Sequence, residues 1–210
     1  MAGSIAKARP GFPAASGQRG NAPGLRARAG PAVLAIALAC STCAHAETRV
    51  YLVRGWFGVF STGMDSMAED LRAKGIRAEA IGHLASKSTA SNIIGEWVAG
   101  KTGRLVLVGH SQGANNAIEM ARELQKHGIS VDLLITLAPF LQDPVPSNVV
   151  RAINYYQSPG WGSALTADDD FKGELANINV ASDASVFHIT IDKDTRVRAE
   201  VMNAILALPP

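Results

Sequence analysis

The segment Gly-His-Ser-Gln-Gly at residues 109–113 contains a serine whose surroundings could make it a nucleophile. It follows the apolar run Leu-Val-Leu-Val at 105–108 and precedes a stretch with helical periodicity. A serine between a strand and a helix lies on a tight turn that exposes its hydroxyl, and glycines beside it make room where a Cβ would clash. An ordinary turn could also contain a serine. The strand before it and the helix after it favour Ser111 as a nucleophile, with the helix N-terminus favouring a developing oxyanion.

A serine hydroxyl is a poor nucleophile until a base takes its proton, and histidine is the usual base. Four histidines lie beyond residue 46. His83 precedes the serine, His110 lies directly beside it, and His127 stands at the end of a predicted helix. Only His188 follows the last predicted strand and precedes the final helix, which is where a general base belongs. We therefore expect His188 to be the base.

A base histidine usually needs a carboxylate that fixes its tautomer, and the acid should come between the serine and the histidine in the chain. Asp143 is our first choice, because it follows the carboxyl end of a strand, where catalytic groups of open α/β sheets gather. The run Asp168, Asp169 and Asp170 is the second, although such a run is also typical of a solvated turn. A pair without a carboxylate, or with another acid, stays open.

Backbone N–H groups should bind the oxyanion: one from the residue after the nucleophile, and one from the loop after an early strand. Here these are Gln112 and a residue of the loop Gly-Trp-Phe-Gly at 55–58, either Trp56 or Phe57. The aromatic side chains that we expect to line an open substrate cleft are Trp56, Phe57, Phe140 and Trp161. The aromatic residues at 56–60 could instead simply cover the edge of the sheet.

The elements that must position these residues alternate along the chain from residue 47 onward. Short β-branched runs predict strands at 49–54, 77–81, 104–108, 131–137, 149–156 and 177–180. Helical periodicity predicts helices at 64–74, 89–99, 114–126 and 195–208, with Asp192 or Asp194 as the N-cap of the last. This alternation predicts an α/β fold, a single domain at 47–210 with a mostly parallel sheet of about six strands, helices on both faces and no large lid.

Residues 1–46 do not resemble part of a folded domain. Residues 1–30 contain Gly, Pro, Ala and Arg but no acidic residue, so they cannot bury enough surface to offset their ordering entropy. An apolar run at 31–40 and Ala-His-Ala at 44–46 follow, which is the layout of a signal peptide with a disordered leader. We expect cleavage after Ala46 and a periplasmic or secreted protein. A membrane anchor is a less favoured reading because the apolar run is short, and a lipid-modified Cys40 is a minor alternative.

Charge and cysteine content exclude several classes of function for residues 47–210. The leader holds five of the 20 Lys and Arg and none of the 18 Asp and Glu, so the remainder has a net charge of −3. No basic patch is left to suggest a nucleic-acid partner. Both cysteines, Cys40 and Cys43, lie in the leader, which excludes a disulfide framework and a cysteine nucleophile. No dinucleotide fingerprint or metal motif is present, so we expect no cofactor and no metal.

Several segments together make most of residues 49–207 similar to the small bacterial lipase-like or thioesterase-like α/β hydrolases. The resemblance includes the segments at 54–65, 109–113, 144–149, 154–157, 160–162 and 188–193. It implies an α/β-hydrolase fold and serine-hydrolase chemistry, with an aspartate often found in the segment that reads Thr-Leu-Ala-Pro at 136–139 here.

The residues and the resemblance together predict an exported serine esterase, lipase-like, that cleaves lipid or short to medium acyl esters through an acyl-enzyme intermediate. Its partner is a small-molecule ester or lipid substrate, with no nucleic acid and no stable membrane span. Oligomeric state cannot be read from the sequence. A thioesterase, or a non-catalytic binding protein that kept the fold, are the alternatives.

Overall fold

The most apolar run of the chain forms a central strand of a parallel sheet. This computed structural model describes residues 47–56, 61–183 and 186–209. Strand β3 (Arg104–His110) has Leu105, Val106, Leu107 and Val108 all buried, as expected for a strand covered on both faces. On one side it pairs with β1 (Thr48–Arg54), and on the other with β4 (Leu133–Leu137).

The sheet contains six parallel strands in the order β2-β1-β3-β4-β5-β6. The remaining strands are β2 (Arg77–Gly82), β5 (Arg151–Tyr156) and β6 (Glu174–Asn179). After β1 the chain moves outward to β2 and then returns to place β3 beside β1, so the strand order reverses between β1 and β3. Ligands of open α/β sheets bind at the carboxyl ends of the strands at such a reversal. Gly55 and Ser111 follow these two strands.

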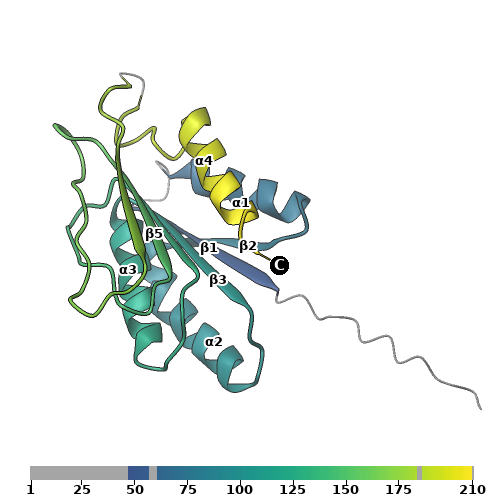
Figure 1. Cartoon of the computed structure of the whole chain (residues 1–210). Coiled ribbons are helices and arrows are strands. Elements are labelled where there is room, and N and C mark those ends of the chain that lie inside the picture. Colours follow the sequence, from purple (N-terminus) through teal and green to yellow (C-terminus); the bar gives the residue numbers. More distant parts are fainter. Residues whose placement is uncertain (1–46, 57–60, 184–185, 210) are drawn as a thin grey trace, which may run out of the picture. The chain divides into compact units, whose positions relative to one another are not determined.

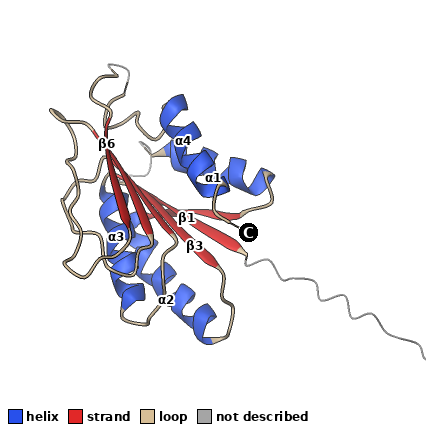
Figure 2. Ribbon diagram, in the orientation of Figure 1, coloured by secondary structure: helices blue, strands red, loops and turns tan. Residues whose placement is uncertain are grey.

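Helices cover both faces of the sheet (Figures 1 and 2). Helices α1 (Thr62–Ala73) and α4 (Thr195–Leu206) bury Met64, Met67 and Val201 with one set of strand side chains. Helices α2 (Ser86–Val98) and α3 (Gln112–Gln125) pack on the other face. A 3₁₀ turn, His83–Ala85, precedes α2. None of the described helices is long and apolar enough to cross a bilayer.

The fold predicted from the sequence is confirmed, with differences at the ends of elements. Helix α2 begins at Ser86 and not near residue 89. The sequence pattern missed its first turn because that turn is rich in serine and lysine and shows little apolar periodicity. Strand β6 begins earlier than expected, at Glu174. Of the two proposed caps for α4, Asp194 is the N-cap, and its carboxylate accepts a hydrogen bond from the Val197 N–H at 2.9 Å.

Irregular segments replace helices on the β5–β6 side of the sheet, where Figure 2 shows long loops. Polar side chains, of which Thr136 and Asn154 are buried, tie one of these loops to the sheet. The Thr136 hydroxyl donates to the Asn154 Oδ1, and the Asn154 Nδ2 donates to the Ser163 carbonyl and to Asn177 Oδ1. The loop therefore closes this part of the sheet without an apolar helix.

The leader predicted at 1–46 lies outside the described residues.

Candidate active site

Ser111 lies in a strained turn between β3 and α3. Its backbone has φ 56° and ψ −126°, which a non-glycine residue rarely adopts. A Cβ on Gly109 would lie 2.3 Å from the Gly113 carbonyl oxygen, and one on Gly113 would lie 2.2 Å from the Val53 carbonyl oxygen. Only glycine fits at both places, as the sequence predicts. The turn presents the Ser111 side chain at the carboxyl edge of the sheet, at the N-terminus of α3.

His188 meets this serine from the loop that follows β6. The Ser111 Oγ and the His188 Nε2 lie 2.9 Å apart, although 77 positions separate the two residues in the chain. Burial is the main cause that lowers the pKa of His188 from 6.5 to about 4, and the neighbouring His110 is the second. His188 is therefore neutral at pH 7 and its Nε2 can accept the serine proton.

The space around these two side chains is small. It has a volume of about 160 Å³ and is lined by Gly55, Trp56, Ser61, His110, Ser111, His188 and Ile189. Sites for drug-sized ligands are usually larger, about 300–1,000 Å³. A small acyl group fits within the space, and a longer group would extend along its rim.

The structure does not bring Asp143 to His188. The Asp143 Oδ2 accepts a hydrogen bond from the Asn115 Nδ2 at 2.7 Å. Asn115 also binds the Phe140 and Leu141 backbone, so a buried amide on α3 holds the loop that carries Asp143. This clamp is the physical reason that a residue at the carboxyl edge of the sheet does not reach the base.

The second choice for the acid is placed elsewhere as well. Asp168 pairs with Arg122 at 2.8 Å, Asp170 accepts from the Ser147 hydroxyl at 2.9 Å, and Asp169 is exposed in the same turn. The His188 Nδ1 is buried and has no hydrogen-bond partner among the residues that the structure describes. Within that part of the chain, the serine and the histidine form a pair without a carboxylate.

The residues predicted for the oxyanion site lie beside the nucleophile where they are described. Gln112 opens α3, so its N–H is among the first donors of the helix, which have no acceptor within it. The Gly55 N–H is already engaged, because it donates to the Ser61 Oγ at 3.0 Å. Trp56 is the next residue and lines the pocket, whereas Phe57 lies outside the described residues. A Cβ on Gly55 would lie 3.0 Å from the Ser111 Cβ, so this close approach requires glycine.

Three of the predicted cleft aromatics stand half-exposed at the same edge. The ring centroids of Trp56 and Phe140 are 5.3 Å apart. Trp161 lies against the base, with 4.5 Å between its ring centroid and that of His188 and 30° between the ring planes. Trp161 therefore contacts the predicted base directly, a contact that its place in the sequence does not reveal.

Asp192 anchors the segment after His188, a contact that the sequence reasoning missed. Its Oδ2 accepts a hydrogen bond from the Gly63 N–H at 2.8 Å, which fastens the segment after His188 to the N-terminus of α1. Burial raises the pKa of Asp192 to about 6. The sequence suggested only that Asp192 could cap α4. The contact with Gly63 joins residues 129 positions apart, so no local pattern could have indicated it.

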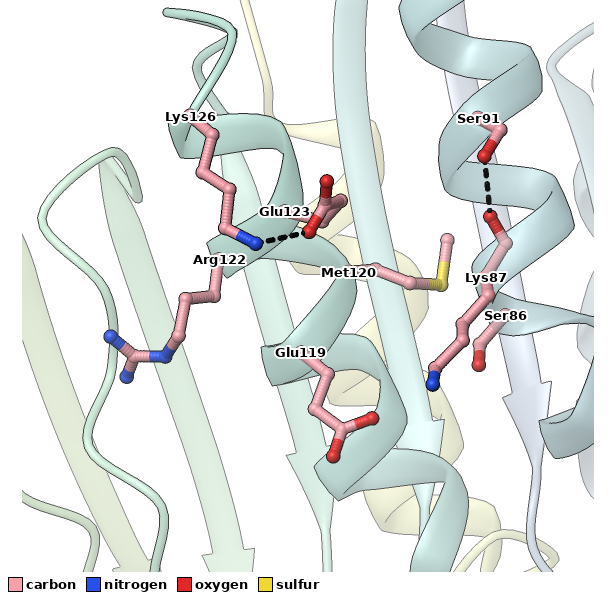
Figure 3. A pocket seen from close by; sticks show the side chains of 8 residues that line it. All are labelled: Ser86, Lys87, Ser91, Glu119, Met120, Arg122, Glu123 and Lys126. Atoms are coloured by element: carbon pink, nitrogen blue, oxygen red, sulfur yellow. Dashed lines mark hydrogen bonds and ion pairs between the residues drawn. The ribbon is translucent and has the colours of Figure 1, made fainter.

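A larger hollow, of about 530 Å³, lies between α2 and α3 (Figure 3). Basic and acidic side chains alternate around it: Lys87, Arg122 and Lys126 with Glu119 and Glu123. Glu123 and Lys126 form an ion pair at 2.6 Å. Ser111 and His188 do not line this hollow, so it is separate from the candidate site. Among the described residues, no cluster of three His, Cys, Asp or Glu side chains could hold a metal ion.

Comparisons with known proteins give likeness only at the level of solved structures. No family model matches the chain, and a search of curated proteins found no match. The NocB thioesterase domain from the nocardicin cluster is 16% identical, with a TM-score of 0.45, over 77% of this chain and 93% of that one.

Two further solved structures show similar values. The type II thioesterase BorB from the borrelidin cluster is 12% identical with a TM-score of 0.46, over 76% of this chain and 93% of that one. A putative hydrolase of the α/β superfamily from Xanthomonas campestris pv. campestris is 17% identical with a TM-score of 0.39, over 74% and 98%. The strand order, the serine turn after β3 and the histidine after β6 are the features by which this chain has the α/β-hydrolase fold.

Proposed function

We propose that this protein is an exported serine hydrolase that cleaves carboxylic esters with short or medium acyl groups. The observation that carries the proposal is the 2.9 Å contact between the Ser111 Oγ, on its strained turn, and the His188 Nε2. A serine on such a turn within reach of a neutral imidazole is the arrangement that nucleophilic catalysis requires.

The first half of the reaction forms an acyl-enzyme. His188 takes the hydroxyl proton at Nε2 while the Ser111 oxygen attacks the carbonyl carbon of the ester. In this proposal, the backbone N–H groups of Gln112 and Trp56 donate to the oxyanion that develops. The tetrahedral intermediate then collapses, and His188 gives its proton to the leaving alkoxide.

The second half repeats these steps with water. His188 takes a proton from a water molecule, whose oxygen attacks the acyl carbon, and Ser111 leaves with the proton from His188. A thioester would give the same acyl-enzyme, with a thiol in place of the alcohol as the first product. The predicted site therefore concerns the acyl group of the substrate, which an ester and a thioester share.

The size and exposure of the site support a short or medium acyl group. The space beside Ser111 and His188 is about 160 Å³. Its rim consists of half-exposed apolar side chains that line the space or contact its lining residues: Trp56, Ile189, Phe140 and Trp161. The first few carbons can enter the space, and additional ones can lie on this rim.

Export rests on the pattern of residues 1–46, and N-terminal sequencing of the periplasmic or secreted form should find Glu47 first.

The decisive test is the Ser111→Ala variant on a panel of p-nitrophenyl esters from acetate to palmitate, with matched acyl thioesters. We expect kcat to fall by roughly 10³-fold or more, because the covalent step is removed while the fold stays intact. Ser91→Ala, at an exposed serine on α2, is the matched control and should hydrolyse like the wild type.

Labelling by a fluorophosphonate probe gives a second readout. Wild-type protein should be labelled at Ser111 and the alanine variant should not. Folded wild-type protein that neither takes the label nor hydrolyses any member of the panel would favour a binding protein. Faster hydrolysis of the thioesters than of the esters at every acyl length would make the protein a thioesterase.

A further inference from the structure

A chain of buried hydrogen bonds joins three loops around the nucleophile. The Gly55 N–H donates to the Ser61 Oγ at 3.0 Å, and the Ser61 Oγ lies 2.8 Å from the His110 Nδ1. The His110 Nε2 lies 2.7 Å from the backbone carbonyl oxygen of His188. Ser61 and His110 are both 1% exposed, so water does not compete for these bonds. The chain thus connects the loop after β1, the nucleophile turn and the loop of the base.

Only one arrangement of protons satisfies this chain. The His188 carbonyl oxygen can only accept, so the His110 Nε2 must carry a hydrogen and donate it. Burial is the main cause that lowers the pKa of His110 to about 4, so this imidazole is neutral and its Nδ1 accepts. The Ser61 hydroxyl therefore donates to Nδ1 while its oxygen accepts from Gly55. One tautomer of His110 is fixed, and it points its donor at His188.

The same base receives no such support at its side chain. In a serine–histidine–aspartate triad, the acid orients the imidazole through Nδ1. Here the His188 Nδ1 has no partner among the described residues, and the indole of Trp161 lies along the ring. The donor from His110 binds the backbone carbonyl of His188 instead. The position of this backbone determines where the His188 ring can lie.

We propose that Ser61 and His110 are positioning residues for the base. His110 donates to the backbone carbonyl of His188 and Ser61 fixes the tautomer of His110. Together they hold the His188 imidazole at Ser111, the task that a triad acid performs through Nδ1. The proposal rests on the proposed hydrolase function. It also assigns a role to the histidine of the Gly-His-Ser-Gln-Gly segment, which the acyl-enzyme mechanism leaves unused.

Two substitutions of His110 separate the contacts that it makes. Gln places its amide nitrogen near the position of Nε2, so His110→Gln keeps a donor for the His188 carbonyl. Asn places its amide near Nδ1, so His110→Asn keeps a partner for Ser61 and loses the donor to His188. The exposed His127, substituted in the same two ways, is the matched control and should change nothing.

We expect His110→Asn to lower kcat by roughly 10- to 100-fold with KM within about twofold, because a displacement of about 1 Å of a catalytic group costs up to about 10²-fold. His110→Gln should retain at least tenfold more activity than His110→Asn. Equal losses in the two variants, wild-type kcat in both, or an effect on KM alone would overturn the proposal.

Titration of the His188 imidazole by NMR tests the positioning without any substrate. Both variants remove the imidazole of His110, and they differ in which of its two contacts they keep: Gln keeps the donor to His188 and Asn keeps the partner for Ser61. In His110→Asn the pKa of His188 should rise from about 4 toward 6.5 as the loop is released, and in His110→Gln it should stay low. Identical titration curves for the two variants would overturn this inference, even if the wild type hydrolyses no ester. The absence of ester hydrolysis would count only against the proposed function.

Ser61→Ala gives a second variant if His110→Asn does not fold. It removes the acceptor for Gly55 and the donor to His110 but leaves the His110–His188 bond in place. We expect a loss of threefold or more in kcat with KM unchanged, since the tautomer of His110 is no longer fixed. Unchanged kcat in folded Ser61→Ala would contradict the role of this chain.

Discussion

The loop after β4 and the loop after β6 leave the same edge of the sheet, and a buried side chain binds the backbone of each. Asn115, on α3, binds the backbone of Phe140 and Leu141 and also the Asp143 carboxylate. His110, at the end of β3, binds the carbonyl of His188. The first loop is held by a helix and the second by the nucleophile turn itself, so only the second brings a functional side chain to Ser111.

A place at the carboxyl edge of a sheet is therefore not enough for a catalytic role. Both Asp143 and His188 follow strands at that edge, and both are polar residues of suitable type. The buried partner of each loop decides where it is fixed. Changes of pH and substitutions in the two loops test this contrast.

The largest expected effect is on stability in acid, and it belongs to the loop of the base. The pKa of His110 and that of His188 are each lowered to about 4 from 6.5. Between these values the unfolded chain binds protons that the folded chain does not, so the free energy of unfolding should fall as the pH drops from 6.5 toward 4. His110, which is strongly buried, contributes about 3 kcal/mol, at about 1.4 kcal/mol for each unit of pKa.

Asp192 should oppose this acid effect. Its pKa is raised to about 6 from 3.8, so the folded chain takes up a proton there before the unfolded chain does, and stability gains as the pH falls through that range. Urea unfolding at pH values from 7 to 4 should therefore show a steeper loss in Asp192→Asn than in the wild type. His110→Gln should show a shallower one. The opposite order would contradict the assignment of these buried groups.

The loop after β4 should respond to Asn115→Ala with a loss of stability and not of chemistry. The substitution leaves backbone groups of Phe140 and Leu141 without their partner, which should cost about 2 kcal/mol in the free energy of unfolding. Asn116→Ala is the control, since its amide makes only long contacts of 3.3–3.5 Å. In the folded fraction, kcat should stay within about threefold of the wild type. A loss as large as that of His110→Asn would mean that this loop also serves the base.

The smallest effect should come from Asp143→Asn. An asparagine oxygen can still accept from the Asn115 Nδ2, so the loop keeps its anchor, and no contact to His188 is lost. We expect turnover on p-nitrophenyl esters within about twofold of the wild type. A fall of a hundredfold, as the sequence-based assignment of Asp143 to the acid requires, would show that this carboxylate reaches His188 during the reaction.

Much of the site follows from the sequence by itself. The order of strands and helices, Ser111 on its turn and His188 after the last strand all rest on signals within about ten residues: apolar runs, helical periodicity, and glycines where a Cβ would clash. Such signals are local because backbone sterics and burial act on neighbouring residues. They are enough to place a nucleophile and a base at the same edge of a parallel sheet.

Only the tertiary structure decided which polar groups pair across the site. The contacts of His110 with His188, Asp192 with Gly63, and Asn115 with Asp143 join residues 78, 129 and 28 positions apart. The sequence predicts Asp143 as the acid and Asp192 only as a possible N-cap of the last helix, because no local pattern indicates which distant group a buried carboxylate will bind. A buried polar side chain binds whichever group the packing of distant elements places within hydrogen-bond distance, and that placement exists only once the chain has folded.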